Sequence, residues 1–438
     1  MACTRREFLI ALSSAGLGAF GASSQIGCVA LRQDDRSKVA RTTHHPLGSQ
    51  DILVVIFLRG GADGLNLLAP VDDRNYIAAR GSELRIRDKG DDKGLEIARA
   101  YGNQDFRLHR AAGPLKELYD SKNLAFIHAS GLTHATRSHF EAQSMMERGI
   151  SDPRGQGVAT GWLTRHIQRS NLSPILPAVA LDSVAPESLL GCAHCVSLVN
   201  PADFRLQAEE PYGKQMQGLL RKFYGGSTPL DQAVTRTLDA IDVVDTRLKR
   251  DEEGNVEEYH PSEGVEYPTD WYATGFSDAL KSLVRLIKMD LGVAVATVSY
   301  DGWDNHENQP EYFPNLVDGL SRGLQAFYND VSSYTKDLSI VVMSEFGRRL
   351  RANESRGTDH GHGNLMMVLG GRVNGGQCYG RWPGLSNEEL DEHVDLAVTT
   401  DYRSVLSELL TKRLGYKILD KMFPGYAGPL DLGIFQLS

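Results

Sequence analysis

The sequence predicts an α/β protein with a doubly wound, mostly parallel sheet and helices on both faces. Its short apolar runs are continuous rather than alternating, as expected for strands that are covered on both faces. Patterns with helical spacing lie between these runs, and that alternation is typical of a parallel sheet. The composition, 41% hydrophobic and 24% charged residues, supports a sizeable buried core.

Six apolar runs are the predicted strands. They lie at 52–58, 124–129, 177–181, 292–299, 339–343 and 365–370. Among the predicted helices, 276–287 is the clearest, because its apolar side chains recur at helical spacing. Similar patterns occupy 316–331, before the fifth strand, and 401–416, near the end of the chain.

One segment departs from this alternation. Residues from about 205 to 270 combine helix-like runs with a polar, acidic stretch. We interpret them as a helical insertion with a surface loop inside an α/β domain that spans 51–438. The sequence contains no internal repeat and no apolar run long enough to predict a membrane span.

The N-terminal residues 1–28 resemble a twin-arginine export signal. Arg5 and Arg6 precede a mildly apolar run that is too short and too rich in small residues for a durable membrane span. A polar linker follows at 29–50. The pattern predicts a periplasmic or secreted protein that uses the twin-arginine export machinery. The alternatives are a plain N-terminal helix and a lipid anchor at Cys28, which we rank below simple cleavage.

Charge and cysteine content narrow the class of protein. The formal net charge of −9 and the absence of a basic block argue against nucleic-acid binding. Of the five cysteines, Cys192 and Cys195 form a CxxC pair, but no second pair exists to complete a zinc site. We interpret this pair as structural or incidental, with a disulfide or a redox-active pair as alternatives.

Polar clusters follow the predicted strands or precede the last one. In open α/β sheets, ligands bind beyond the carboxyl ends of the strands, so these clusters are expected to meet at one edge. The metal-ligand candidates in them are Asp63, Asp304, His306, Glu345, Asp359, His360 and His362.

The residue types in these clusters point to a divalent metal. Asp304 and His306 are two residues apart, as are His360 and His362, so an extended backbone directs each pair to one side. Carboxylates and imidazoles without thiolates suit Zn, Mn, Mg or Ca, as one or two ions. Each cluster also has a structural interpretation, such as an Asx turn or an ion pair with a neighbouring arginine.

Ser138 is the preferred nucleophile candidate, with Thr136 and Thr133 as alternatives. The stretch "SHFE" also predicts a capping box between Ser138 and Glu141 at the start of a helix. The two interpretations are compatible, because a helix N-terminus stabilises an anionic intermediate.

Three further side chains have candidate roles at this site. Arg137 and Arg348 are candidates for holding an anionic group. His139 would either bind an anionic substrate or simply cover the surface.

Several motifs in order resemble a known family. "LRGGADGLN", "RSHFEAQ", "DGWDNH", "SEFGRR" and "GTDHGHGN" are similar to the domain of unknown function 1501 family of exported proteins. That family in turn resembles the alkaline phosphatase and sulfatase superfamily. The resemblance implies an alkaline-phosphatase-like α/β fold with metal ions at the strand ends.

The resemblance also implies roles for individual residues. Asp63 takes the place of the acid after the first strand, and Ser138 lies near the place of the nucleophile. Asp304, His306, Glu345 and either His360 or His362 take the places of ligands. Phe346 stands where many of those enzymes carry a ligand histidine.

The resulting hypothesis is a metal-dependent hydrolase of phosphate or sulfate esters, acting on small molecules or glycans. The alternative is a catalytically silent envelope protein that binds glycans or a protein partner on the same scaffold.

Overall fold

The computed structural model describes residues 51–97, 101, 104–153, 158–170, 175–206, 212–416, 421–428 and 431–436. The predicted export signal at 1–28, with Arg5, Arg6 and Cys28, and the linker at 29–50 lie outside the described residues. Both remain predictions.

A nine-stranded sheet runs through the domain in the order β11-β5-β10-β9-β1-β8-β6-β7, and β12 pairs with β5. The strands are β1 Ile52–Leu58, β5 Leu124–Gly131, β6 Ala178–Ala180, β7 Cys195–Ser197, β8 Val295–Tyr300, β9 Leu338–Met343, β10 Asn364–Gly370, β11 Cys378–Tyr379 and β12 Thr400–Asp401. Each of the six apolar runs is therefore a strand of this sheet.

The sheet is mostly parallel. At its centre, β1 pairs in parallel with both β8 and β9, with Leu53 opposite Val295 on one side and Ser339 on the other. β10 runs antiparallel to β9 and to β5. The doubly wound, mostly parallel architecture is confirmed.

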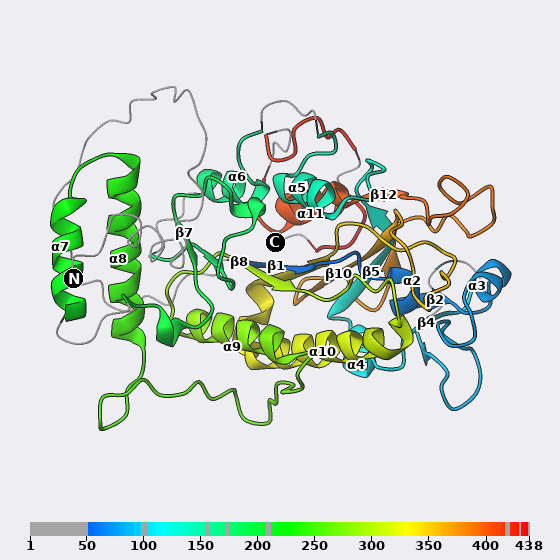
Figure 1. Ribbon diagram of the computed structural model, residues 1–438, viewed down its shortest axis with the longest axis horizontal. Helices are drawn as coiled ribbons and strands as arrows, with labels where there is room; N and C mark the ends of the chain where they lie inside the picture. The colour runs from blue at the N-terminus through cyan, green and yellow to red at the C-terminus, as the bar shows by residue number, and fades with distance from the viewer. Residues whose placement is uncertain are drawn as a thin grey trace.

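Helices cover both faces of the sheet (Figure 1). One face carries α4 Gly113–Asp120, α9 Thr274–Lys288 and α10 Gln309–Asp330, and the other carries α5 His139–Arg148, α6 Trp162–Arg169 and α11 Tyr402–Lys412.

Alternate side chains of β1 serve the two layers. Val54 and Ile56 belong to the core cluster with α9 and α10, whereas Val55 and Phe57 belong to the cluster with α5, α6 and α11. Burial on both faces explains why this strand is a continuous apolar run.

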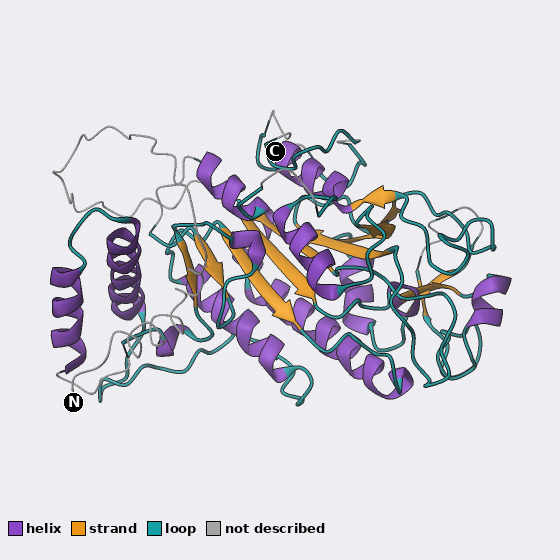
Figure 2. Cartoon of the chain, turned by 45° about the horizontal axis from the view of Figure 1, so that its top comes forward, coloured by secondary structure: helices purple, strands orange, loops and turns teal. Residues whose placement is uncertain are grey.

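Smaller elements lie at the two ends of the sheet (Figure 2). At one end are α2 Gly64–Leu67, α3 Arg74–Ala79 and a three-stranded antiparallel sheet of β2 Leu68–Pro70, β3 Leu95–Glu96 and β4 Phe106–Leu108. At the other end, α7 Tyr212–Phe223 packs against α8 Pro229–Arg247. The short 3-10 helices are η1 Glu187–Leu189, η2 Pro201–Asp203 and η3 Ser332–Asp337.

Three further expectations concern the helical insertion, a membrane span and the cysteines. α7 and α8 lie within the range expected to be a helical insertion, and its status as a separate unit remains a prediction. Within the described residues no helix combines the length and apolarity needed to cross a bilayer. Cys192, Cys195 and Cys378 are free thiols.

Candidate metal centre

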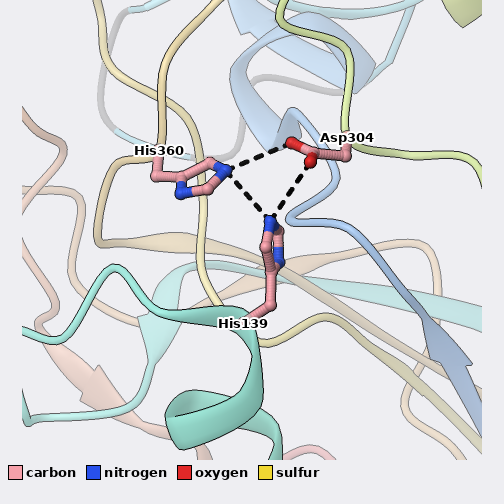
Figure 3. Close-up of side chains that lie close together, drawn as sticks. All are labelled: His139, Asp304 and His360. Carbon is pink, nitrogen blue, oxygen red and sulfur yellow. Dashed lines mark hydrogen bonds and ion pairs between the residues drawn. The ribbon is translucent and has the colours of Figure 1, made fainter.

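Three side chains from separate segments converge at the edge of the sheet (Figure 3). His139 is the first residue of α5, Asp304 follows β8, and His360 precedes β10; one ligand atom of each lies within 4.8 Å of the others. His139 Nε2 is 3.0 Å from His360 Nε2 and 3.4 Å from Asp304 Oδ2. His360 Nε2 is 3.1 Å from Asp304 Oδ1.

His306 brings a fourth donor atom to the same place. Its Nε2 lies 2.8 Å from His360 Nε2 and 3.0 Å from Asp304 Oδ1. Three imidazole nitrogens and one carboxylate therefore face one another.

The far nitrogen of each histidine ring contacts an acceptor. His139 Nδ1 lies 2.7 Å from Glu345 Oε1, and His306 Nδ1 lies 3.3 Å from Asp359 Oδ1. His360 Nδ1 lies 2.9 Å from the carbonyl oxygen of Arg137. Because ionised carboxylates and carbonyl oxygens only accept hydrogen bonds, each Nδ1 carries the proton. The neutral form of each ring then has its lone pair on Nε2.

This tautomer assignment creates a need for positive charge between the rings. When all three rings are neutral, three lone pairs and a carboxylate at separations of 2.8–3.4 Å repel one another unless a proton or a metal cation lies among them. A metal ion satisfies them, and histidine ligands that donate their second N–H to a carboxylate or carbonyl are the usual arrangement at metal sites. The residues present therefore fit a divalent metal.

Glu345 is the buried anion behind His139. Its Oε1 accepts hydrogen bonds from Gly60 N at 2.9 Å and Gln143 Nε2 at 2.7 Å, besides facing His139. Burial alone would raise the pKa of Glu345, but these hydrogen bonds hold it below its ordinary value. The bond to Glu345 in turn raises the pKa of His139.

Asp304 is ionised as well. Burial alone would raise its pKa, but the ion pair with Arg348 at 2.6 Å and the bond to His360 lower it to about 2. Arg348 is itself buried and also donates to the carbonyl oxygens of Gly61 at 2.6 Å and Thr358 at 2.8 Å. Its guanidinium thus fixes the Asp304 carboxylate to the backbone around it.

His360 is held in its neutral form. Burial, the largest influence, lowers its pKa below the ordinary histidine value. A neutral ring is the form that binds a metal.

Two glycines let the loop carrying His360 approach its neighbours. A Cβ at Gly357 would lie 2.2 Å from the carbonyl oxygen of His306, and one at Gly361 would lie 2.5 Å from the carbonyl carbon of Arg348. The stretch "GTDHGHG" is therefore glycine-rich because the backbone packs directly on the backbone of the other site segments.

The structure brings together some of the predicted ligands and separates others. Asp304, His306 and His360 meet, while Glu345 and Asp359 contact the Nδ1 atoms of His139 and His306, on the far side of each ring from the cluster. Asp63 accepts from Arg80 at 2.5 and 3.1 Å and from Gln309 Nε2 at 2.7 Å. His362 Nδ1 lies 2.5 Å from Asp391, and its Nε2 lies 2.8 Å from the carbonyl oxygen of Leu132. Both residues have other partners and lie outside the cluster.

Ser138 is the N-cap of α5 and is exposed, but its side chain makes no cap hydrogen bond. The expected capping box does not form, because Glu141 accepts instead from Thr136 Oγ1 at 2.5 Å. The backbone N–H of Ser138 donates to the same hydroxyl at 3.2 Å. Thr133 is exposed in the loop before α5.

Arg137 is partly exposed beside these residues. It pairs with Asp395 at 2.5 Å and with Glu392 at 2.7 Å. Its role in holding an anion stays a prediction, as does that of Arg348.

His139 is the ligand candidate that sequence reasoning did not assign to the metal. It lacks the two-residue spacing that marks the other histidines, and the sequence suggests for it only substrate binding or a place on the surface. The available signal was its position after the end of a buried strand, shared with the other polar clusters.

A family model supports the resemblance found in the sequence. The family described as protein of unknown function (DUF1501) matches residues 277–416. The matched range contains Asp304, His306, Glu345 and His360 but not His139. No curated protein matches the chain by sequence.

Solved structures with a similar arrangement include three named proteins. Ps i-CgsB in complex with k-i-k-neocarrahexaose is 10% identical, with 87% of this chain and 75% of that chain covered and a TM-score of 0.39. A protein in the alkaline phosphatase superfamily from Vibrio parahaemolyticus is 11% identical, with 74% and 60% covered and a TM-score of 0.31. The C-terminal periplasmic domain of EcEptC from Escherichia coli, a complex with Zn, is 8% identical, with 74% and 73% covered and a TM-score of 0.32.

Proposed function

We propose that this chain is a metal-dependent hydrolase of phosphate or sulfate esters, with one ion held by His139, Asp304, His306 and His360. The observation that carries the proposal is the set of three Nε2 lone pairs facing one carboxylate. Three imidazoles favour zinc, with manganese second, because Mg²⁺ and Ca²⁺ prefer oxygen ligands.

The exposure of the cluster supports a catalytic role. The side chains of Asp304 and His306 are 46% and 39% exposed, so solvent and small molecules reach the donor atoms. Structural zinc sites are closed by protein ligands, whereas catalytic sites keep an open position. A bound ion would polarise the ester oxygen and lower the pKa of a nearby hydroxyl or water.

Ser138 is the proposed nucleophile on the protein side. It directly precedes His139, and its exposed hydroxyl is not used in a helix cap. The positive end of α5 lies beside it and would stabilise negative charge on a transferred group. The Ser138 oxygen would form a bond to phosphorus or sulfur as the bond to the alcohol oxygen breaks, and the hydroxyl proton would leave with the alcohol. Water would then hydrolyse the ester on Ser138, which restores the hydroxyl and releases phosphate or sulfate.

We also propose that the protein acts outside the cytoplasm, because residues 1–28 resemble a twin-arginine signal. The proposed substrates are small-molecule or glycan esters.

A second candidate function, a catalytically silent protein that binds glycans or a protein partner, is favoured by one observation. Arg348, a candidate for holding the substrate anion, is buried and already donates to Asp304 and four carbonyl oxygens.

Metal analysis of the chain expressed with zinc, followed by assays with aryl phosphate and aryl sulfate esters, tests both functions. His360→Ala is the site variant, and His393→Ala is the matched control, because His393 is exposed and outside the cluster. We expect about one ion per chain in the wild type and the control, but not in His360→Ala. Hydrolysis that follows metal content supports the hydrolase, and metal without hydrolysis supports the silent protein. Absence of metal from the wild type would refute the site.

A further inference from the structure

A second pocket lies beside the first turns of α10, away from the four donors of the metal centre. It has a volume of about 110 Å³, and residues of α2, the segment after α3, the segment after β4 and α10 line it. None of His139, Asp304, His306 and His360 lines it. The volume exceeds what one water needs, about 10–15 Å³, and is small for an organic ligand.

Two acids and two arginines line this pocket, but they do not pair with one another. Two acids line it, and each pairs with an arginine that does not: Glu83 with Arg356 at 2.9 Å, and Asp92 with Arg87 at 3.4 Å. The two arginines that do line it, Arg85 and Arg110, make no ion pair with any described residue. Among the described residues, Arg85 and Arg110 are therefore the charged lining groups that have no ion-pair partner.

A neutral hydrogen-bond donor lies beside these arginines. His109 Nδ1 accepts from the backbone N–H of Ala111 at 3.2 Å, so the neutral ring carries its proton on Nε2. Burial, and then the neighbouring Arg110, lower the pKa of His109 to about 4. Near neutral pH the ring is therefore uncharged, and Nε2 is its donor.

Asn66 adds a buried amide without a partner. The residue is 3% exposed, and its side chain makes no hydrogen bond with a described residue; its Oδ1 is fully covered. The Oδ1 atom is an acceptor and cannot bind an anion, whereas Nδ2 is a donor that has no partner among the described residues and is free to face a ligand. Pro310 and Pro314 also line the pocket and have no backbone N–H to offer.

We propose that this pocket binds a small tetrahedral oxyanion, inorganic phosphate or sulfate, between Arg85 and Arg110, with His109 and Asn66 as further donors. Guanidinium groups match the oxygens of such anions. The positive N-terminal end of α10 adds to the attraction. The inference does not depend on the proposed hydrolysis.

The test uses the full chain after metal removal with a chelator, so that an anion bound to the metal is not counted. Titrations with phosphate and with sulfate are followed by calorimetry and by the thermal unfolding midpoint, against chloride at equal ionic strength. We expect a midpoint that rises with either oxyanion, by mass action. His360→Ala should behave as the wild type.

The decisive variant is the double change Arg85→Gln and Arg110→Gln, which should weaken binding at least tenfold. Arg74→Gln is the matched control, because Arg74 is exposed, has no ion pair among the described residues and lies outside the pocket. The proposal is overturned if phosphate and sulfate act no differently from chloride, if the double variant binds as well as the control, or if His360→Ala abolishes binding.

The anion could be a free ion or the phosphoryl group of a larger molecule, and binding of a phosphate monoester distinguishes these two sources. Binding as tight as that of inorganic phosphate would assign the pocket to the phosphoryl group of a larger molecule. That result would overturn the proposal that the ligand is the free ion. Binding of the monoester that is much weaker than that of inorganic phosphate would support the proposal.

Discussion

Replacing Glu345 by glutamine removes a negative charge from behind the His139 ring while keeping the shape of the side chain. The Glu345 side chain is 0% exposed, and its Oε1 lies 2.7 Å from His139 Nδ1, so no water can take over this contact. Changes of this kind, one shell behind a metal ligand, weaken metal affinity by about 10–100-fold. That range corresponds to about 1.4–2.8 kcal/mol, and full burial places Glu345→Gln near its upper end.

The assay is a competition titration with a chromophoric zinc chelator on the folded variant and the wild type. Glu354→Gln is the matched control, because Glu354 lies on the loop that carries His360 but is exposed. Circular dichroism establishes that both variants are folded. If Glu345→Gln binds zinc within twofold of the control, the carboxylate does not fix the His139 ring, and the tautomer argument fails.

Three further predictions concern stability and the site. Asp330→Asn should destabilise the fold by about 2 kcal/mol at neutral pH in denaturant titrations, because the buried Asp330 carboxylate accepts from Lys288 at 2.6 Å and from Ser262 N at 2.8 Å. Burial raises the pKa of Asp330, but these partners lower it further, so that the net shift is downward. The stabilisation by the carboxylate is therefore present above the unfolded-state pKa and is lost as the pH falls through the folded-state pKa. The difference in unfolding free energy between wild type and variant should disappear in acid, and a difference that stays constant with pH would contradict this. Chelation of the zinc-loaded chain should lower its unfolding midpoint in calorimetry but leave that of His360→Ala unchanged, and equal shifts would mean that the ion binds elsewhere. Arg348→Lys should reduce zinc affinity at least tenfold in the competition titration, because lysine cannot bridge Asp304 and the carbonyl oxygens, and unchanged affinity would show that Asp304 needs no such support.

The strands could be predicted from the sequence because their physical cause is local. A strand buried on both faces needs a run of apolar residues, and the run at 52–58 matches β1 residue for residue. The antiparallel direction of β10 could not be predicted, because an apolar run has no direction. β7 at Cys195–Ser197 and the two-residue β11 and β12 are too short to leave a pattern.

The candidate site could be predicted only in part. Asp304, His306 and His360 stood out because they are polar residues near the ends of buried strands. A carboxylate is available to a metal only if no other residue of the fold pairs with it. Asp63 pairs with Arg80, and the sequence does not reveal that contact. The capping box failed for a similar reason, since Glu141 binds the Thr136 hydroxyl.

The four donors of the candidate metal centre come from widely separated parts of the chain. His139 and His360 are 221 positions apart, whereas Asp304 precedes His360 by 56. A fragment limited to 277–416 would carry three donors and lack the fourth, so that part of the chain cannot form the centre as an autonomous module. An ion bound by all four would cross-link the early and late parts of the chain. Its presence would therefore show that both parts had been synthesised and had folded together.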